Sequence, residues 1–338
     1  MVNSISFSSV NMIELNGKKF MRKIANENER QTTIDQIFYL KCLPENIKKY
    51  FPRIEEYTIN DRYVSYLMPF YNMLQLDEAL LSSSIKKNQI ILVLEKLIDI
   101  MFLEIYPKFH IPTPKDYFLV MHYNRAINRI KYLLNQRADL FNLINSPYLI
   151  INGKECVNGA NLLNKIVDSS YFKLLSPPFI GLVHGDLEAN HIMFDFKNKS
   201  DIDIILLDPR VTNKGGDLAY DLAKLYQSID GYSHEIQRGS FKFDINYSGK
   251  YPEILFLING HRDFKEYNLI KNQLDKNINR HATYSDCSNW KARTSFIEAV
   301  HFLSAPPFFM HSQTDRIAEA LYIQGVYLLN EFVQSINL

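Results

Sequence analysis

The sequence predicts an α+β protein of two lobes, with a small sheet-rich lobe over residues 1–70 and a larger, mainly helical lobe over residues 71–338. Short segments rich in Val, Ile, Tyr and Phe, ending at Asn, Gly or Pro, fill the first part of the chain. From Leu76 onward apolar residues recur at helical spacing. A block of short apolar runs that end at acids interrupts this helical part, which indicates a site built at strand ends.

Composition excludes several classes of protein. The 338 residues are 46% hydrophobic and 22% charged, which is ordinary for a globular chain with a large core. Lys and Arg number 38 against 37 Asp and Glu, so the net charge of +1 gives no footprint for nucleic acid. The longest apolar stretch, residues 90–105, carries four charges and is not expected to enter a membrane. The N-terminus has no secretory pattern, and Cys42, Cys156 and Cys287 form no CxxC pair, so we expect a cytoplasmic protein.

In the small lobe, turn-forming residues separate four strand-like segments and one helix. The expected helix is TIDQIFYLKCLP, residues 33–44. The expected strands are residues 5–15, 18–25, 53–59 and 62–70.

In the large lobe the apolar spacing predicts a series of helices. The clearest begins at Ile90, where apolar positions recur at steps of three and four up to Phe102. Further helices are expected at about 123–144, 158–175, 217–228 and 315–332.

Between these helices, residues 179–209 contain the segments FIGLVHGD, HIMFDF and DIILLDP, which are expected to be strands. Asp186 follows the first strand and Asp208 ends the last. A loop carboxylate at Asp186 can accept the proton of a substrate hydroxyl, and a second at Asp208 can bind a metal ion, so the pair suits phosphoryl transfer.

HGDL, the LLD strand and GDLAYDLA resemble the aminoglycoside/choline phosphotransferase family. DPR after that strand, together with a downstream FFMH, is similar to a bacterial subgroup associated with surface-polysaccharide synthesis. The resemblance is sharp only from His184 to Leu222. It implies a bilobed, protein-kinase-like fold that uses ATP and Mg²⁺.

The resemblance also implies residue roles. Asp186 would be the catalytic base, His184 a scaffold of the loop, and Asp208 a magnesium ligand. The second ligand of the family is an Asn, whose position is held here by His191, with Asn190 one place earlier. Because Mg²⁺ prefers oxygen donors, the choice between His191 and Asn190 stays open.

Three other residues between His184 and Leu222 also have expected roles. Arg210 is positioned to pair either with a phosphate or with a carboxylate of the catalytic loop, and the second is favoured. Asp217 and Asp221 are expected to cap or anchor a helix and brace the loop.

On the nucleotide side, KKFMRK resembles the strand that carries a phosphate-binding lysine. That makes Lys23 the candidate, with Arg22 and Lys19 as competitors if the register differs. Gln36 stands where relatives commonly carry a Glu partner for this lysine, and Asp35, Glu27 or Glu29 are the substitutes.

Two further segments complete the expected nucleotide site. The phosphate loop has no glycine, and Ser8 and Ser9 would supply its hydrogen bonds. The strand RYVSYLMPF resembles the hinge, whose backbone at Ser65, Tyr66 and Leu67 would meet the adenine edge.

The sequence therefore predicts a small-molecule kinase acting on a hydroxyl of a sugar, amino alcohol or glycan precursor. Two alternatives keep the fold: a nucleotide-binding pseudokinase or scaffold, and an enzyme that transfers a nucleotidyl group. The identity of the acceptor, ATP versus GTP and the oligomeric state are left open.

Overall fold

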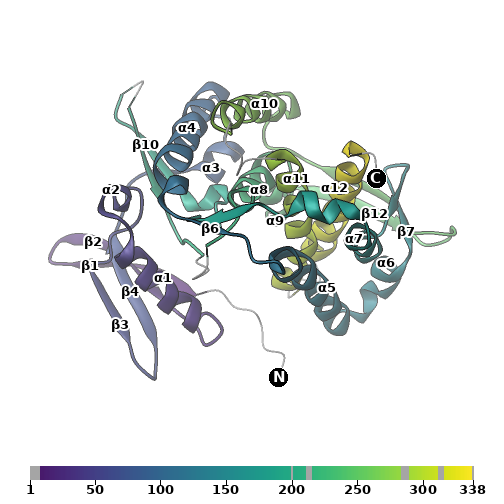
Figure 1. Ribbon diagram of the computed structural model, residues 1–338, viewed down its shortest axis with the longest axis horizontal. Helices are drawn as coiled ribbons and strands as arrows, with labels where there is room; N and C mark the ends of the chain where they lie inside the picture. The colour runs from purple at the N-terminus through teal and green to yellow at the C-terminus, as the bar shows by residue number, and fades with distance from the viewer. Residues whose placement is uncertain (1–7, 199–200, 211–214, 283–288, 311–315, 337–338) are drawn as a thin grey trace.

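The computed structural model has two lobes, and it describes residues 8–198, 201–210, 215–282, 289–310 and 316–336. In Figure 1 the small lobe, in purple, lies at one end of the molecule, and the helices of the large lobe fill the other. The predicted α+β architecture, with a sheet-rich first lobe and a helical second lobe, is confirmed.

A four-stranded antiparallel sheet with the order β1-β2-β4-β3 forms the small lobe. Asn16 and Gly17 make the turn between the first two strands, with φ values of 52° and 70°. These left-handed angles are those of a two-residue hairpin turn. All four strands fall inside segments predicted as strands: β1 (Ser9–Leu15), β2 (Lys18–Ile24), β3 (Glu56–Ile59) and β4 (Val64–Pro69).

Helix α1 (Arg30–Cys42) covers one face of this sheet. Ile37 of α1 forms a small core with Val64, Tyr66 and Met68 of β4. The following helix, α2 (Glu45–Lys48), is different, because its Ile47 is buried in the core of the large lobe. The segment after α1 therefore belongs by packing to the second lobe.

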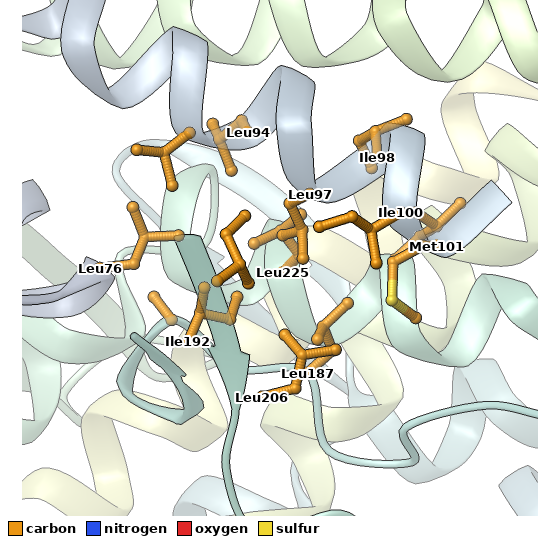
Figure 2. Packing of buried hydrophobic residues seen from close by; sticks show 14 of the residues in the cluster. Leu76, Leu94, Leu97, Ile98, Ile100, Met101, Leu187, Ile192, Leu206 and Leu225 are labelled. Carbon is orange, nitrogen blue, oxygen red and sulfur yellow. The ribbon is translucent and has the colours of Figure 1, made fainter. Parts of the chain in front are cut away.

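The core of the large lobe lies directly beneath the expected catalytic segment. Figure 2 shows Leu187, Ile192 and Leu206 of that segment facing Leu97 of α4 (Lys87–Ile100) and Leu225 of α8 (Leu218–Ile229). All five side chains are completely buried. Burial of this kind contributes about 1.5–3 kcal/mol for each large apolar side chain, so the segment that carries the acids is fixed on a rigid base.

The two strands of that segment form an antiparallel hairpin, β10 (Ile192–Phe196) and β11 (Ile202–Leu206), as the sequence predicted. The short strand β5 (Leu74–Gln75) pairs with β10 on the other side. The first predicted strand is shorter than expected: only β9 (Phe179–Gly181) is extended, and it pairs with β6 (His110–Pro112).

Helices surround this hairpin, and a four-stranded sheet with the order β12-β13-β7-β8 lies at the far end of the large lobe. The predicted helix at 123–144 is divided into two because the chain leaves the helical conformation at Arg137. The remaining elements are α3 (Leu76–Leu81), α4 (Lys87–Ile100), α5 (Asn124–Gln136), α6 (Phe141–Asn145), β7 (Tyr148–Ile151), β8 (Lys154–Val157), α7 (Gly159–Asp168), α8 (Leu218–Ile229), α9 (Ser233–Gln237), β12 (Phe241–Asn246), β13 (Glu253–Ile258), α10 (Phe264–His281), α11 (Trp290–Ser304) and α12 (Ile317–Ser335).

Within the described residues, no helix is both long and apolar enough to cross a membrane. Cys42 and Cys156 are free thiols. Cys287 lies outside the described residues.

Candidate active site

The HGD loop between β9 and β10 is held from two sides. The buried carboxylate of Asp221, on α8, accepts the backbone N–H of His184 and that of Gly185, each at 2.7 Å. On the other side the backbone N–H of Arg210 donates to the carbonyl of His184 at 2.8 Å. Gly185 has a φ of +79°, and a Cβ there would lie 1.9 Å from the carbonyl oxygen of Arg210. The loop is therefore clamped between α8 and the DPR segment.

His184 has the scaffold role expected of it. Its ring is completely buried, and its Nδ1 accepts the backbone N–H of Asp186 at 3.2 Å. Burial, aided by the charge of His191, lowers the pKa of His184 to about 4. A neutral ring that accepts from the backbone shapes the loop and leaves the Asp186 carboxylate to contact other groups.

Asp208 follows β11 in a left-handed conformation, with a φ of 53°. A non-glycine residue in this region is strained, and such strain is concentrated at functional sites. Its carboxylate forms an ion pair with Lys23 and accepts from Gln36 Nε2 at 2.7 Å. Burial alone would raise the pKa of Asp208, but the charges of Lys23, His191 and Arg210 outweigh it and lower the pKa to about 2.

Two cationic or imidazole side chains bridge the acids. Arg210 Nε lies 3.7 Å from Asp186 Oδ2, and its Nη2 lies 3.8 Å from Asp208 Oδ2. His191 also lies between the two acids, with Nδ1 3.8 Å from Asp186 Oδ2 and Nε2 4.0 Å from Asp208 Oδ2. The structure thus brings Asp186 and Asp208 into one site.

The register and burial of β2 favour Lys23 among the three basic candidates, because Lys19, on the same face, is exposed. Side chains alternate between the two faces of a strand, so Lys23 and Arg22 face opposite sides. Lys23 is buried on the side covered by α1, where its Nζ donates to Gln36 Oε1 at 3.0 Å. Arg22 lines a hollow of about 330 Å³ on the opposite side of the sheet. Neither Asp186 nor Asp208 lines this hollow.

Gln36 occupies the place of the acid that was expected to pair with Lys23. Two of the acids proposed as alternative partners of Lys23 contact other residues. Glu29 pairs with Arg210, with Nη1 to Oε2 at 2.8 Å. Asp35 accepts from Gln31 on the exposed side of α1. The closest carboxylate to Arg210 is therefore Glu29, outside the catalytic loop, and Asp186 of that loop is more distant, at 3.7 Å.

Lys224 and Glu188 are site residues that sequence reasoning missed. Lys224 Nζ donates to Asp186 Oδ1 at 2.9 Å and to Glu188 Oε1 at 2.6 Å. Burial would lower the pKa of Lys224, but the two carboxylates raise it well above its usual value. A signal for Lys224 was available, because it stands three residues after Asp221 on one helix and so shares a face with it.

The residues around Asp208 fit a magnesium ion. His191 Nδ1 lies 2.7 Å from the carbonyl oxygen of Asp186, which can only accept, so this nitrogen donates, and Nε2 is the ring nitrogen that faces Asp208. Asn190 Oδ1 is buried and has no hydrogen-bond partner within the described residues. No group of three or more His, Cys, Asp or Glu residues suited to a metal occurs in the described ranges. Mg²⁺ needs no such cage, because one or two carboxylates and substrate phosphates suffice.

Two of the expected nucleotide contacts lie near Lys23. Ser9 begins β1 opposite Ile24, the neighbour of Lys23, and Ser8 precedes it. Both serines therefore lie at the end of the sheet that carries the lysine.

The expected adenine contacts of Ser65, Tyr66 and Leu67 need correction. These residues form the middle of β4, which is paired with β2 on one side and β3 on the other. Both edges of the strand are used within the sheet, so this backbone has no donor or acceptor left for a base. Tyr66 has a structural role instead, with its hydroxyl donating to Gln36 Oε1 at 3.0 Å.

No protein-family model matches the chain, and no curated protein matches it. Among solved structures, a protein described as a fructosamine-3-kinase from Haemophilus somnus 129PT is 12% identical with a TM-score of 0.50, over 96% of this chain and 88% of that one. The choline kinase LicA from Streptococcus pneumoniae is 10% identical with a TM-score of 0.46, over 95% and 89% of the two chains. At such identities the likeness shows the fold alone, and that fold is kinase-like.

Proposed function

We propose that the protein is a small-molecule kinase that transfers the γ-phosphoryl group of Mg-ATP to a hydroxyl of a sugar, amino alcohol or glycan precursor. The observation that carries this proposal is the meeting of Asp186 and Asp208 around Arg210 and His191, with Lys23 on the far side of Asp208. Phosphoryl transfer needs an orienting carboxylate for the nucleophile, a metal-binding carboxylate and a cation on the phosphates, and this site offers all three.

On the nucleotide side, Asp208 with His191 or Asn190 would hold the magnesium ion, which neutralises phosphate charge when bound. Lys23 now pairs with Asp208. When the nucleotide binds, Lys23 would exchange this carboxylate for phosphate oxygens. Ser8 and Ser9 would donate hydrogen bonds to the same phosphates.

On the acceptor side, Asp186 would orient the hydroxyl for in-line attack. Burial would raise the pKa of Asp186, but Lys224, His191 and Arg210 lower it far below its usual range. The carboxylate is therefore ionised and a weak base at neutral pH. Such a group positions the hydroxyl by accepting its hydrogen bond and takes the proton late in the transfer.

The test is ATP turnover with a panel of sugars, amino alcohols and glycan precursors, followed by mass spectrometry of the product. A gain of one phosphate on the acceptor supports the proposal. A gain of a nucleoside monophosphate would instead support nucleotidyl transfer.

One observation favours a pseudokinase as the second candidate. Gln36 contacts Lys23 where a carboxylate would hold the lysine charged and in place, and His191 stands at the position of an oxygen ligand. A pseudokinase is expected to gain thermal stability with ATP and to turn it over with none of the acceptors. Turnover with any acceptor excludes it.

A further inference from the structure

Two arginines on α5 lie side by side behind the catalytic aspartate. Arg125 Nη1 donates to the hydroxyl of Tyr220, on α8, at 2.7 Å. Arg129, one turn further along α5, donates to the carbonyl of Ser304 at 3.2 Å and lies 4.7 Å from the centre of the Phe308 ring. Both guanidinium groups thus face the gap between α8 and the end of α11.

Both guanidinium groups belong to half-buried residues, and neither forms an ion pair with a carboxylate of the described residues. By comparison, two buried arginines are neutralised: Arg137 pairs with Glu319, and Arg293 pairs with Asp217. Burial and the neighbouring charge of Arg125 lower the pKa of Arg129 to about 10. Both groups therefore stay charged at neutral pH, with no carboxylate of the described residues at ion-pair distance.

Two buried histidines pack against Tyr220 as well. His122 and His301 are buried beside Tyr220, with ring centroids 6.3 and 4.5 Å from its ring. Their four ring nitrogens have no hydrogen-bond partner in the described part of the chain. Burial, with the charge of Arg125, lowers the pKa of His122 to about 3, so this ring is neutral. Unused polar atoms and unpaired cations therefore meet in one place.

This cluster lies next to the proposed point of phosphoryl transfer. Tyr220 and Lys224 are one turn apart on α8, and Lys224 contacts Asp186. The charge of Asp186 acts on both Arg125 and Arg129. An acceptor whose hydroxyl meets Asp186 would extend past Lys224 and Tyr220 toward the two arginines.

We propose that Arg125 and Arg129, with the hydroxyl of Tyr220, bind a phosphate or carboxylate group of the acceptor, so that the substrate is an anionic hydroxyl compound. Guanidinium groups match both anions by paired N–H donors. The inference rests on the proposed kinase function. It deepens that function by naming the charge of the acceptor.

The test measures binding in the absence of nucleotide, by calorimetry, with glucose 6-phosphate, glucuronate and neutral glucose, and with inorganic phosphate as the bare anion. We expect an anionic compound to bind and glucose to bind at least tenfold more weakly. Arg125→Gln and Arg129→Gln should each weaken anion binding by at least tenfold. Lys131→Gln, which removes an exposed charge from the same helix, should leave it unchanged. Arg125→Lys, which keeps the charge, should retain part of the affinity and guards against a misfolded variant.

Three outcomes overturn the inference: no anion binds, glucose binds as tightly as the anions, or the glutamine variants bind like the wild type. A fourth is displacement of the anion by Mg-AMP-PNP, which would assign the arginines to the nucleotide phosphates. The two proposals fail separately. If the arginines bind anions but no acceptor supports ATP turnover, the kinase function is refuted and the anion site stands. If only neutral acceptors support turnover, the anionic acceptor is refuted and the kinase function stands.

Discussion

The α-carbon of Gly185 approaches the carbonyl oxygen of Arg210 so closely that a Cβ would lie 1.9 Å from it. Gly185→Ala should therefore displace the DPR segment from the HGD loop. Left-handed φ alone costs an alanine about 1–2 kcal/mol, and the overlap adds to this. We expect the free energy of unfolding to fall by more than about 3 kcal/mol and turnover to be lost.

Gly239→Ala is the matched control, because Gly239 also has a left-handed φ, of +72°, but has no atom within 4 Å of a Cβ. Denaturant unfolding of both variants separates the cost of φ from the cost of overlap. Equal losses in the two variants would contradict the role given to the contact with Arg210.

Asp186→Asn and Asp208→Asn should differ in which step they impair. Asp186 faces the acceptor, so its amide variant should lose turnover by about 10²–10⁴-fold with nearly unchanged affinity for Mg-ATP. Asp208→Asn should weaken magnesium-dependent nucleotide binding itself. Calorimetry with Mg-AMP-PNP, beside turnover assays, measures both. A fully active Asp186→Asn, or an Asp208→Asn with unchanged nucleotide affinity, would refute the corresponding role.

Lys224→Met should change the pH dependence of catalysis. The ammonium group of Lys224 helps to hold the pKa of Asp186 low, so its removal raises that pKa. The acid limb of kcat/KM should then move to higher pH by about one to three pH units. Lys276→Met, an exposed change on α10, serves as the control. A limb that stays in place in the Lys224 variant would exclude the coupling.

Asp221→Asn should destabilise the HGD loop in a pH-dependent way. The amide has one acceptor oxygen for two backbone N–H groups, and leaving one unsatisfied costs about 1–3 kcal/mol. Burial raises the pKa of Asp221 to about 7. A raised acid pKa contributes stability that is present below the unfolded pKa of about 3.9 and is lost as the pH rises through about 7.

The free energy of unfolding of the wild type relative to Asp221→Asn should therefore decline between pH 5 and pH 7.5. The slope is at most about 1.4 kcal/mol per pH unit. Urea unfolding of both proteins at the two pH values measures it. A relative stability that rises with pH would show that the two N–H donors outweigh burial.

The parts of the fold that could be predicted are those determined by local sequence patterns. The hairpin β10–β11 and the positions of Asp186 and Asp208 follow from short apolar runs that end in acids. The mistaken base contact at Ser65–Leu67 had a different origin. Whether a strand has a free edge depends on pairing with β2, far away in the sequence, and no local pattern of β4 shows it.

The sequence also contains a helical pattern from which α10 could have been predicted. Tyr267, Ile270, Leu274 and Ile278 recur at helical steps and form the buried face of α10, which was not predicted. By contrast, the absence of a carboxylate partner for Arg125 among the described residues had no sequence signal, because it depends on which side chains the tertiary fold places around α5.

Among the described residues, the buried members of the separate core of the small lobe are Ile37, Val64, Tyr66 and Met68, while Ile47 is anchored in the large lobe. Such a core is too small to hold four strands together without support, since three or four buried side chains offset little of the entropy of ordering them. A fragment ending at Pro69 would therefore remain unfolded. In the whole protein, the strands would move over a helical base that stays in place, and amide exchange should be faster in β1 than in α2.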